Sequence, residues 1–237
     1  MGLGGKRVVI IGGSSGIGLA VAAGSLAEGA EVFIGSSQDS KVAEARQQLE
    51  GPVDGAAVNV RDEESIAGFF KRAGPFDHLV FTAGDWGPRD PKAITDVKVE
   101  DFTNLLAVRF YGALLAVKHA VPQIREGGSI TLTDGVTAHR PRKGAPLAAA
   151  MAGAVEHLVS GLAVDLAPIR VNGVCPGVIG TAVWGPDAAE QFRAIIDPLP
   201  LSRIGKPEEV AEAYLYAMKG GYTTGQVMLV DGGRFLV

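Results

Sequence analysis

Short apolar runs rich in β-branched residues alternate with longer stretches of helical pattern along this chain. The apolar runs predict strands near residues 7–12, 31–35, 55–60, 78–83, 129–133, 169–174 and 226–230. The intervening stretches predict helices near 16–28, 40–50, 62–73, 99–125, 146–167, 187–197 and 207–219. This rhythm is typical of parallel sheets with both faces covered. We therefore expect residues 1–237 to form one doubly wound α/β domain, a seven-stranded parallel sheet with helices on both faces.

The composition limits the class of protein. Hydrophobic residues make up 47% of the 237 residues and charged residues 20%, which is enough for a sizeable core. The net charge of −4 offers no basic surface for DNA or RNA. The N-terminal apolar run is too short for a signal peptide or a membrane span. These features predict a cytoplasmic protein without a nucleic-acid or membrane partner.

Residues that commonly bind metals are few and scattered. The single cysteine, Cys175, fits a reducing compartment and lies in an apolar run, so we interpret it as a small buried hydrophobe. The four histidines, at positions 78, 119, 139 and 157, have no metal-ligand spacing. The sequence therefore predicts no metal site.

A glycine-rich loop follows the first predicted strand and opens the first predicted helix. Glycines allow the backbone to turn tightly and approach a ligand, and free N–H groups at a helix start favour a pyrophosphate. At a strand-to-helix junction, this pattern predicts a dinucleotide-binding Rossmann domain, with a purely structural turn as the alternative. The segment GGSSGIG supplies the candidate contacts Gly12, Ser14, Ser15, Gly16, Ile17 and Gly18.

The end of the second predicted strand bears on the choice of nicotinamide cofactor. An acid there hydrogen-bonds the adenosine ribose and would repel a 2′-phosphate. This chain has Ser36 and Ser37 instead, whose hydroxyl and backbone N–H groups can donate to a phosphate, and Lys41 follows. The segment favours NADP(H) over NAD(H).

Several motifs in a fixed order resemble the short-chain dehydrogenase/reductase family, and the resemblance runs almost from end to end. The glycine loop is the first of them, and PLSRIGKPEEVAEA and TTGQVMLVDGG resemble the family's closing helix and last strand. The resemblance implies that Asn59 and Val60 flank the adenine, and that TAG (82–84) corresponds to the family's Asn-Ala-Gly after the fourth strand. It implies further cofactor contacts at Ala83, Gly84, Pro176, Gly177, Val178 and Thr181.

The catalytic residues of that family are replaced. Family members use an Asn, a Ser and a Tyr-x-x-x-Lys pair, in which the Tyr donates a proton to a carbonyl oxygen as hydride arrives. Arg109 stands at the Asn position, and Asp134 at the Ser position, with Gly135 in the alternative register. Leu147 stands at the Tyr position and Met151 at the Lys position, which predicts an apolar floor to the substrate pocket.

Arg109 and Asp134 are the ionisable groups left for chemistry. To stay protonated near neutrality, an aspartic acid needs a pKa about 3 units above its ordinary value, roughly 4 kcal/mol. A neighbouring arginine would oppose that shift, so we expect Asp134 to be a carboxylate that serves as counterion or acid, with Arg109 as hydrogen-bond donor. Because an iminium carbon accepts hydride without a proton donor, the pair favours reduction of an imine or iminium in a cyclic, apolar molecule.

Two other activities remain open. The substitutions also resemble a branch of the family, the fungal bifunctional reductase/Diels–Alder enzymes of bicyclic indole alkaloid biosynthesis. That resemblance implies a cycloaddition beside the bound cofactor, with Trp86 over the substrate. Alternatively, Arg109 and Asp134 form a salt bridge in a catalytically dead member that binds the cofactor as a scaffold or sensor.

Two predicted helices, 99–125 and 146–167, are apolar on nearly all sides. Each must bury one face on the sheet, and the apolar surface that remains suggests a second subunit. We expect a homodimer or homotetramer, with well-covered core helices as the alternative.

Overall fold

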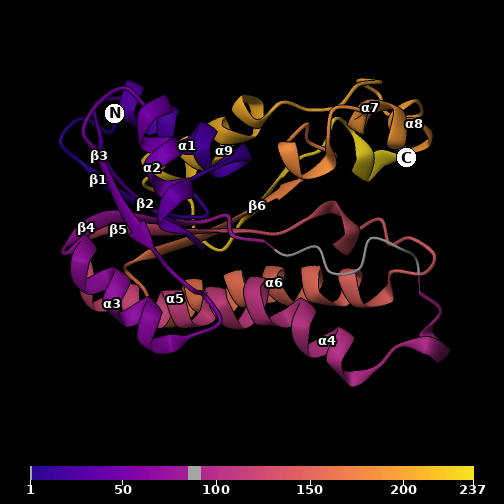
Figure 1. The fold of residues 1–237 in the computed structure, drawn as a ribbon, viewed down its shortest axis with the longest axis horizontal. Helices are drawn as coiled ribbons and strands as arrows, with labels where there is room; N and C mark the ends of the chain where they lie inside the picture. The colour runs from indigo at the N-terminus through magenta and orange to yellow at the C-terminus, as the bar shows by residue number, and fades with distance from the viewer. Residues whose placement is uncertain (1, 85–91) are drawn as a thin grey trace.

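The computed structural model describes residues 2–84 and 92–237, and these contain one seven-stranded sheet of order β3-β2-β1-β4-β5-β6-β7 (Figure 1). Every neighbouring pair of strands is parallel, so the predicted doubly wound sheet is confirmed. The strands are β1 (Arg7–Ile11), β2 (Glu31–Ser36), β3 (Val53–Ala57), β4 (Phe76–Phe81), β5 (Ile124–Thr133), β6 (Arg170–Pro176) and β7 (Val227–Val230).

Strand β3 ends earlier than the apolar pattern predicts, and this matters for the site. It pairs only with β2, and the pairing runs from Val32 opposite Val53 to Ser36 opposite Ala57. The segment 58–60, which the pattern places inside the strand, therefore follows the end of β3, where the Val58 backbone N–H donates to the Ser36 carbonyl oxygen at 2.7 Å. The reason is that pairing with the neighbouring strand, rather than apolar character, sets the end of an edge strand.

Helices cover both faces of the sheet (Figure 1). One face carries α1 (Gly16–Ala27), α2 (Asp39–Gln48) and α9 (Pro207–Lys219), and the other carries α3 (Glu63–Ala73), α4 (Val99–Leu106), α5 (Ala113–Ala120) and α6 (Pro146–Asp165). Each face has its own buried apolar cluster, because strands covered on both sides point alternate side chains into two cores. The short helices α7 (Ala188–Gln191) and α8 (Arg193–Ile196) lie between β6 and α9 in the chain.

The helix predicted over 99–125 is interrupted. Between α4 and α5 the backbone forms a wider, π-helical segment, η2 (Ala107–Gly112). Segments of this kind are rare and are frequent at functional sites, because the extra residue in the turn redirects a side chain. Here the segment carries Arg109, which is 5% exposed.

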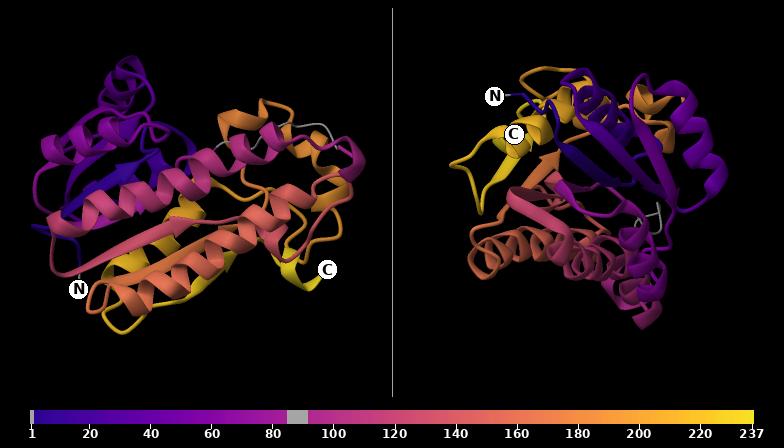
Figure 2. Two further views of the ribbon diagram at one scale, coloured as in Figure 1. Left: turned by 90° about the horizontal axis from the view of Figure 1, so that it is seen from below. Right: turned by 90° about the vertical axis from the view of Figure 1, so that its left-hand side faces the viewer.

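The α4–α5 segment and α6 lie side by side on one face of the sheet (Figure 2). Residues Val99–Gln123 and Pro146–Asp165 are long and apolar enough to cross a membrane by length and composition, and both pack on the sheet in this fold. Large apolar side chains stay exposed on their outer surfaces at Val99, Phe102, Tyr111, Leu114 and Val164. A second subunit on this face remains a prediction.

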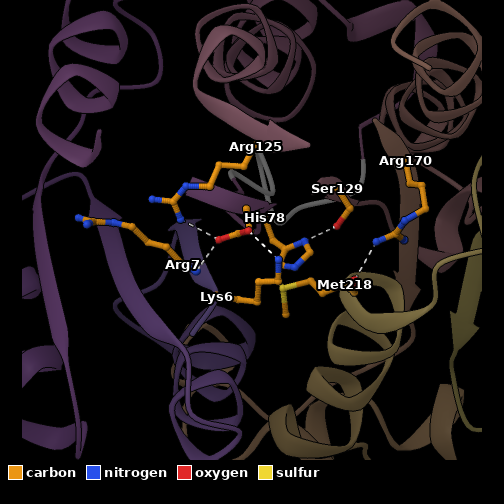
Figure 3. A network of polar contacts seen from close by, with 8 residues as sticks. Lys6, Arg7, His78, Arg125, Ser129, Arg170 and Met218 are labelled. Atoms are coloured by element: carbon orange, nitrogen blue, oxygen red, sulfur yellow. Dashed lines mark hydrogen bonds and ion pairs between the residues drawn. The ribbon is translucent and has the colours of Figure 1, made fainter. Parts of the chain in front are cut away.

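A polar network near the amino end of β4 joins three strands (Figure 3). Asp77 accepts hydrogen bonds from Lys6 Nζ at 3.0 Å, from the Arg7 backbone N–H at 2.9 Å and from Arg125 Nη1 at 3.0 Å. Burial raises the pKa of Asp77, but these hydrogen bonds outweigh it and lower the pKa overall. The buried His78 shares a hydrogen bond with Ser129 Oγ at 2.9 Å, and burial lowers its pKa to about 4.

Candidate functional site

A cavity of about 590 Å³ lies at the carboxyl ends of the strands, where the chain order reverses between β1 and β4. Ligands bind at such switch points because the loops on either side diverge there. The wall is built from the β1–α1 loop and from residues that follow β2, β3, β4 and β6, with η2 closing one side.

The β1–α1 loop has no room for side chains at its two tightest positions. Gly12 has a positive φ of 94°, and a Cβ at this position would lie 2.5 Å from the Ala83 backbone nitrogen. A Cβ at Gly18 would lie 2.2 Å from the Gly12 carbonyl oxygen. The loop therefore folds tightly against the end of β4 and brings the N-terminus of α1 to the cavity, which suits a pyrophosphate.

Most of the predicted cofactor contacts form the wall of this cavity. It includes Gly12, Ser14, Ser15, Gly16, Ile17, Gly18, Ser36, Ser37, Asn59, Val60, Ala83, Gly84, Pro176 and Thr181. Within this set, Ser14 Oγ donates to Ser36 Oγ at 2.8 Å, which joins the β1–α1 loop to the end of β2. Segments from five parts of the sequence thus meet around one elongated ligand space.

Gly177 and Val178, two of the expected cofactor contacts, are not among the residues that line this cavity. The Gly177 N–H donates to the Val230 carbonyl oxygen at 3.0 Å and continues the pairing between β6 and β7. Val178 lies on a separate cavity of about 110 Å³. These two contacts of Gly177 and Val178 with other parts of the fold leave their role in cofactor binding as a prediction.

The ionisable residues of the described wall are all basic. Lys41 and Arg61 lie with Ser36 and Ser37 at the end formed by β2 and β3, and Arg109 lies on η2. The described wall contains no Asp or Glu. Arg61 was not among the predicted contacts, although this residue directly follows the Asn59–Val60 pair that the family motif marks as an adenine contact.

Arg109 is nearly buried and faces the strand ends. Its Nη1 donates to the backbone carbonyl oxygen of Asp134 at 3.5 Å. The guanidinium also lies against the backbone of Gly84, where no side chain intervenes. Arg109 therefore occupies the position that the sequence predicted, at the cavity wall beside the end of β4.

Asp134 differs from the prediction, because it is 2% exposed and does not line the cavity. Successive residues of an extended chain point to opposite sides, and the preceding residue, Thr133, is the one on the wall. Burial, followed by the effect of the neighbouring Glu156, raises the pKa of Asp134 to about 8. The hydrogen bond from Arg109 goes to the Asp134 backbone carbonyl oxygen, and the role of Asp134 as counterion or acid stays a prediction.

The predicted substrate-pocket residues do not line the described cavity either. Met151 is 5% exposed and belongs to the core between α6 and the sheet, and Leu147 packs against the same core. Trp86 lies outside the described residues. The apolar character of α6 at these two positions thus contributes to packing on the sheet.

No tyrosine replaces the missing acid in the described part of the wall. Tyr214 is completely buried, and its hydroxyl shares a hydrogen bond with Thr133 Oγ1 at 2.6 Å. Burial raises the pKa of the Tyr214 phenol well above its usual range. Tyr111 and Tyr216 are half exposed on outer helix surfaces. The described part of the wall therefore offers no tyrosine hydroxyl as a proton donor.

Comparison with known proteins agrees with this geometry. Residues 12–234 match a family described as enoyl-(acyl carrier protein) reductase. The chain is 36% identical to Short-chain dehydrogenase/reductase ucsE of an Acremonium species, covering 98% of this chain and 96% of the relative. It is 35% identical to Short-chain dehydrogenase/reductase malC of Malbranchea aurantiaca, covering 98% and 95%.

Solved structures give the same result. The MalC Reductase/Diels-Alderase of Malbranchea aurantiaca is similar with a TM-score of 0.92 and 34% identity, over 99% of this chain and 98% of that one. A small-chain dehydrogenase in complex with NADPH has a TM-score of 0.81 and 31% identity, over 98% and 100%. Together with the glycine loop and the parallel sheet, these similarities show that the chain belongs to the short-chain dehydrogenase/reductase family of nicotinamide-dependent oxidoreductases.

Proposed function

We propose that this protein is an NADP(H)-dependent reductase of atypical mechanism, acting on a carbon–nitrogen double bond in a cyclic, largely apolar small molecule. The observation that carries the proposal is a cavity wall made by most of the predicted cofactor contacts, beside Arg109, with no tyrosine on its described part. Reduction of a ketone leaves an alkoxide that must be protonated, whereas hydride addition to an iminium carbon yields a neutral amine directly. The residues present therefore suit C=N better than C=O.

The charges of the wall support NADP(H) over NAD(H). Lys41 and Arg61 lie near Ser36 and Ser37, with no carboxylate on the described wall. A 2′-phosphate gains charge-assisted hydrogen bonds from such groups, whereas the ribose of NAD(H) would lack its usual acidic partner.

In the proposed mechanism, bound NADPH supplies the hydride, and the protein binds and orients. The β1–α1 loop holds the pyrophosphate with backbone N–H groups, and Thr181 lies at the nicotinamide end. Arg109, at the wall beside Gly84, donates a hydrogen bond to an oxygen of the substrate and fixes the C=N carbon next to the cofactor. Asp134 contributes no ligand contact in this scheme, because it lies outside the wall.

A second candidate activity is an intramolecular cycloaddition beside the cofactor, alone or after reduction. The similarity to the MalC Reductase/Diels-Alderase, with its TM-score of 0.92, favours it. Such a reaction requires a shaped, water-poor pocket and an oriented hydrogen-bond donor, and Arg109 fits the second requirement. The candidate from another class is a cofactor-binding scaffold without turnover.

A screen of cyclic imines and iminium ions with NADPH, followed by product analysis, tests these candidates. Oxidation of NADPH with formation of amine supports the reductase. A cyclised product whose yield does not depend on NADPH oxidation supports the cycloaddition. Tight NADPH binding by calorimetry with neither reaction contradicts both enzymatic proposals and leaves the scaffold.

The Arg109→Ala variant tests whether Arg109 contacts the substrate during the reaction, and Arg109→Lys is the conservative comparison. Loss of a buried charged hydrogen bond, about 1.5–3 kcal/mol, should lower kcat/KM roughly tenfold to a hundredfold. NADPH affinity should stay within about threefold, because the cofactor wall is otherwise intact. Full activity in Arg109→Ala would show that this residue makes no contact in the transition state.

A further inference from the structure

Four side chains with metal-binding atoms meet where β5, the loop after it, α6 and β6 come together. They are Asp134, His139, Glu156 and Cys175, and one ligand atom from each lies within 4.8 Å of all the others. The sequence predicts no metal site, because its histidines lack metal-ligand spacing, and this group brings together residues that such spacing does not relate. Sequence spacing gave no sign of it, because the four residues come from three separate parts of the chain: the loop after β5, α6 and β6.

This group is separate from the cofactor site. None of the four residues is on the described wall of the large cavity, whereas the neighbours Thr133 and Pro176 are. Asp134 directly follows Thr133, and Cys175 directly precedes Pro176. Because successive side chains of an extended backbone point to opposite sides, Asp134 and Cys175 point away from the cavity. That side faces α6, which provides Glu156.

The group contains a buried carboxyl that lacks a partner. Asp134 is 2% exposed, and among the described residues neither of its oxygens has a hydrogen-bond partner. Glu156 has one ionic partner in the described chain, His139, with Nε2 to Oε1 at 2.6 Å, whereas the ion pairs include none for Asp134. A buried carboxyl group without a hydrogen-bond partner is costly, and a bound cation would satisfy it.

We propose that Asp134, His139, Glu156 and Cys175 form a tetrahedral zinc site. A thiolate, an imidazole and carboxylates are the ligands that Zn²⁺ takes in proteins, whereas Mg²⁺ and Ca²⁺ prefer oxygen ligands alone. Bonds of the usual length place tetrahedral zinc ligands about 3.3–3.8 Å apart. The four ligand atoms thus need to contract by roughly an ångström, which side-chain rotation can supply.

The proposed zinc site would be structural and not catalytic. Four protein ligands leave no open position for water or substrate, which is typical of structural zinc. The ion would join the end of β5 to the loop, to α6 and to β6, next to the two cavity residues Thr133 and Pro176. Zinc binding would release protons, because the thiol and the carboxyl groups bind the metal in their deprotonated forms.

Cobalt provides a direct test, since Co²⁺ takes the same tetrahedral ligands and is coloured. Cys175 is the only cysteine of the chain, so a thiolate-to-cobalt charge-transfer band can come from this residue alone. Chelator-treated protein is titrated with Co²⁺ and then with Zn²⁺. We expect the charge-transfer band and tetrahedral d–d bands to rise to one equivalent and to disappear when zinc displaces cobalt. A wild-type protein without a charge-transfer band overturns the proposal.

Variants assign the remaining ligands. Glu156→Gln and His139→Ala should each lower zinc affinity at least about tenfold in a chelator competition. Changing a residue that only hydrogen-bonds a metal ligand already lowers metal affinity by about that factor, so removal of a ligand should cost no less. His157→Ala is the matched control, because His157 is exposed on α6, one residue from Glu156. Equal zinc affinity in all three variants would also overturn the proposal. NADPH binding, measured separately, does not depend on this result.

Discussion

The guanidinium of Arg109 lies so close to the backbone of Gly84 that a Cβ on Gly84 would be 2.4 Å from Nη2. This contact holds Arg109, the one charged side chain of η2, at the cavity wall, at the end of β4. It also explains why the segment after β4 has a glycine where the arginine packs. The position of Arg109 therefore depends on the absence of a side chain at Gly84.

The first prediction concerns this contact. Gly84→Ala should push the guanidinium aside and lower turnover about as much as Arg109→Ala does. Because both changes act on the same guanidinium group, the effects should not add: the turnover of the double variant should be no lower than that of the less active single variant. Gly153→Ala is the control, since a Cβ there meets nothing within 4 Å, and it should leave turnover unchanged. Additive losses would show that Gly84 acts independently of Arg109.

The second prediction concerns cofactor choice. Lys41→Ala should weaken NADPH binding about fivefold to tenfold, roughly 1 kcal/mol, and leave NADH within about twofold. The difference is expected because only NADPH carries a 2′-phosphate, which we propose binds near Ser37 and Lys41. Lys71→Ala, on the exposed surface of α3, serves as the control. Calorimetric titration at two salt concentrations checks it, and equal losses for both cofactors would contradict the phosphate assignment.

The third prediction concerns stability against pH. The folded protein holds the pKa of His78 at about 4 instead of 6.5, through burial above all, with Arg170 and Lys6 adding to the shift and Asp77 opposing it. Because the unfolded chain binds the proton and the folded one does not, this contribution to stability falls as the pH drops from 6.5 to about 4. Over that range His78 should account for a loss of about 3 kcal/mol.

His78→Gln makes the contribution measurable. Urea unfolding of both proteins across this pH range gives two free-energy profiles, and the wild-type profile should fall more steeply towards low pH. The difference between the profiles isolates His78 from other groups, including Asp134, whose raised pKa acts in the opposite direction. Parallel profiles would mean that His78 takes up its proton equally in both states.

The fourth prediction concerns Tyr214, the tyrosine that contacts the wall residue Thr133. Tyr214→Phe removes a hydroxyl in a hydrogen bond with Thr133 Oγ1 and should cost about 1 kcal/mol of unfolding free energy. Turnover should stay within about twofold, because the phenol is buried behind the wall and holds its proton tightly. Thermal unfolding and steady-state kinetics check the two parts. A large loss of turnover without a loss of stability would identify Tyr214 as the missing acid.

The parallel sheet, the glycine loop and most of the cofactor wall were predictable from the sequence. Local patterns determine them, because a strand buried on both sides must be apolar and a loop that approaches a phosphate closely needs glycine at positions such as Gly12 and Gly18. The family motifs placed Arg109, Asn59 and Thr181 correctly on the wall.

Only the tertiary structure decided where Asp134 points and what surrounds it. A shift of one residue along extended backbone exchanges the two sides of a sheet, so motif alignment alone could not separate Asp134 from the wall. Likewise, His139, Glu156 and Cys175 have no regular spacing, and the packing of α6 on β5 and β6 brings them together. Long-range packing decides which side chains from separate segments lie close together, and the periodicity within one segment contains no information about such contacts.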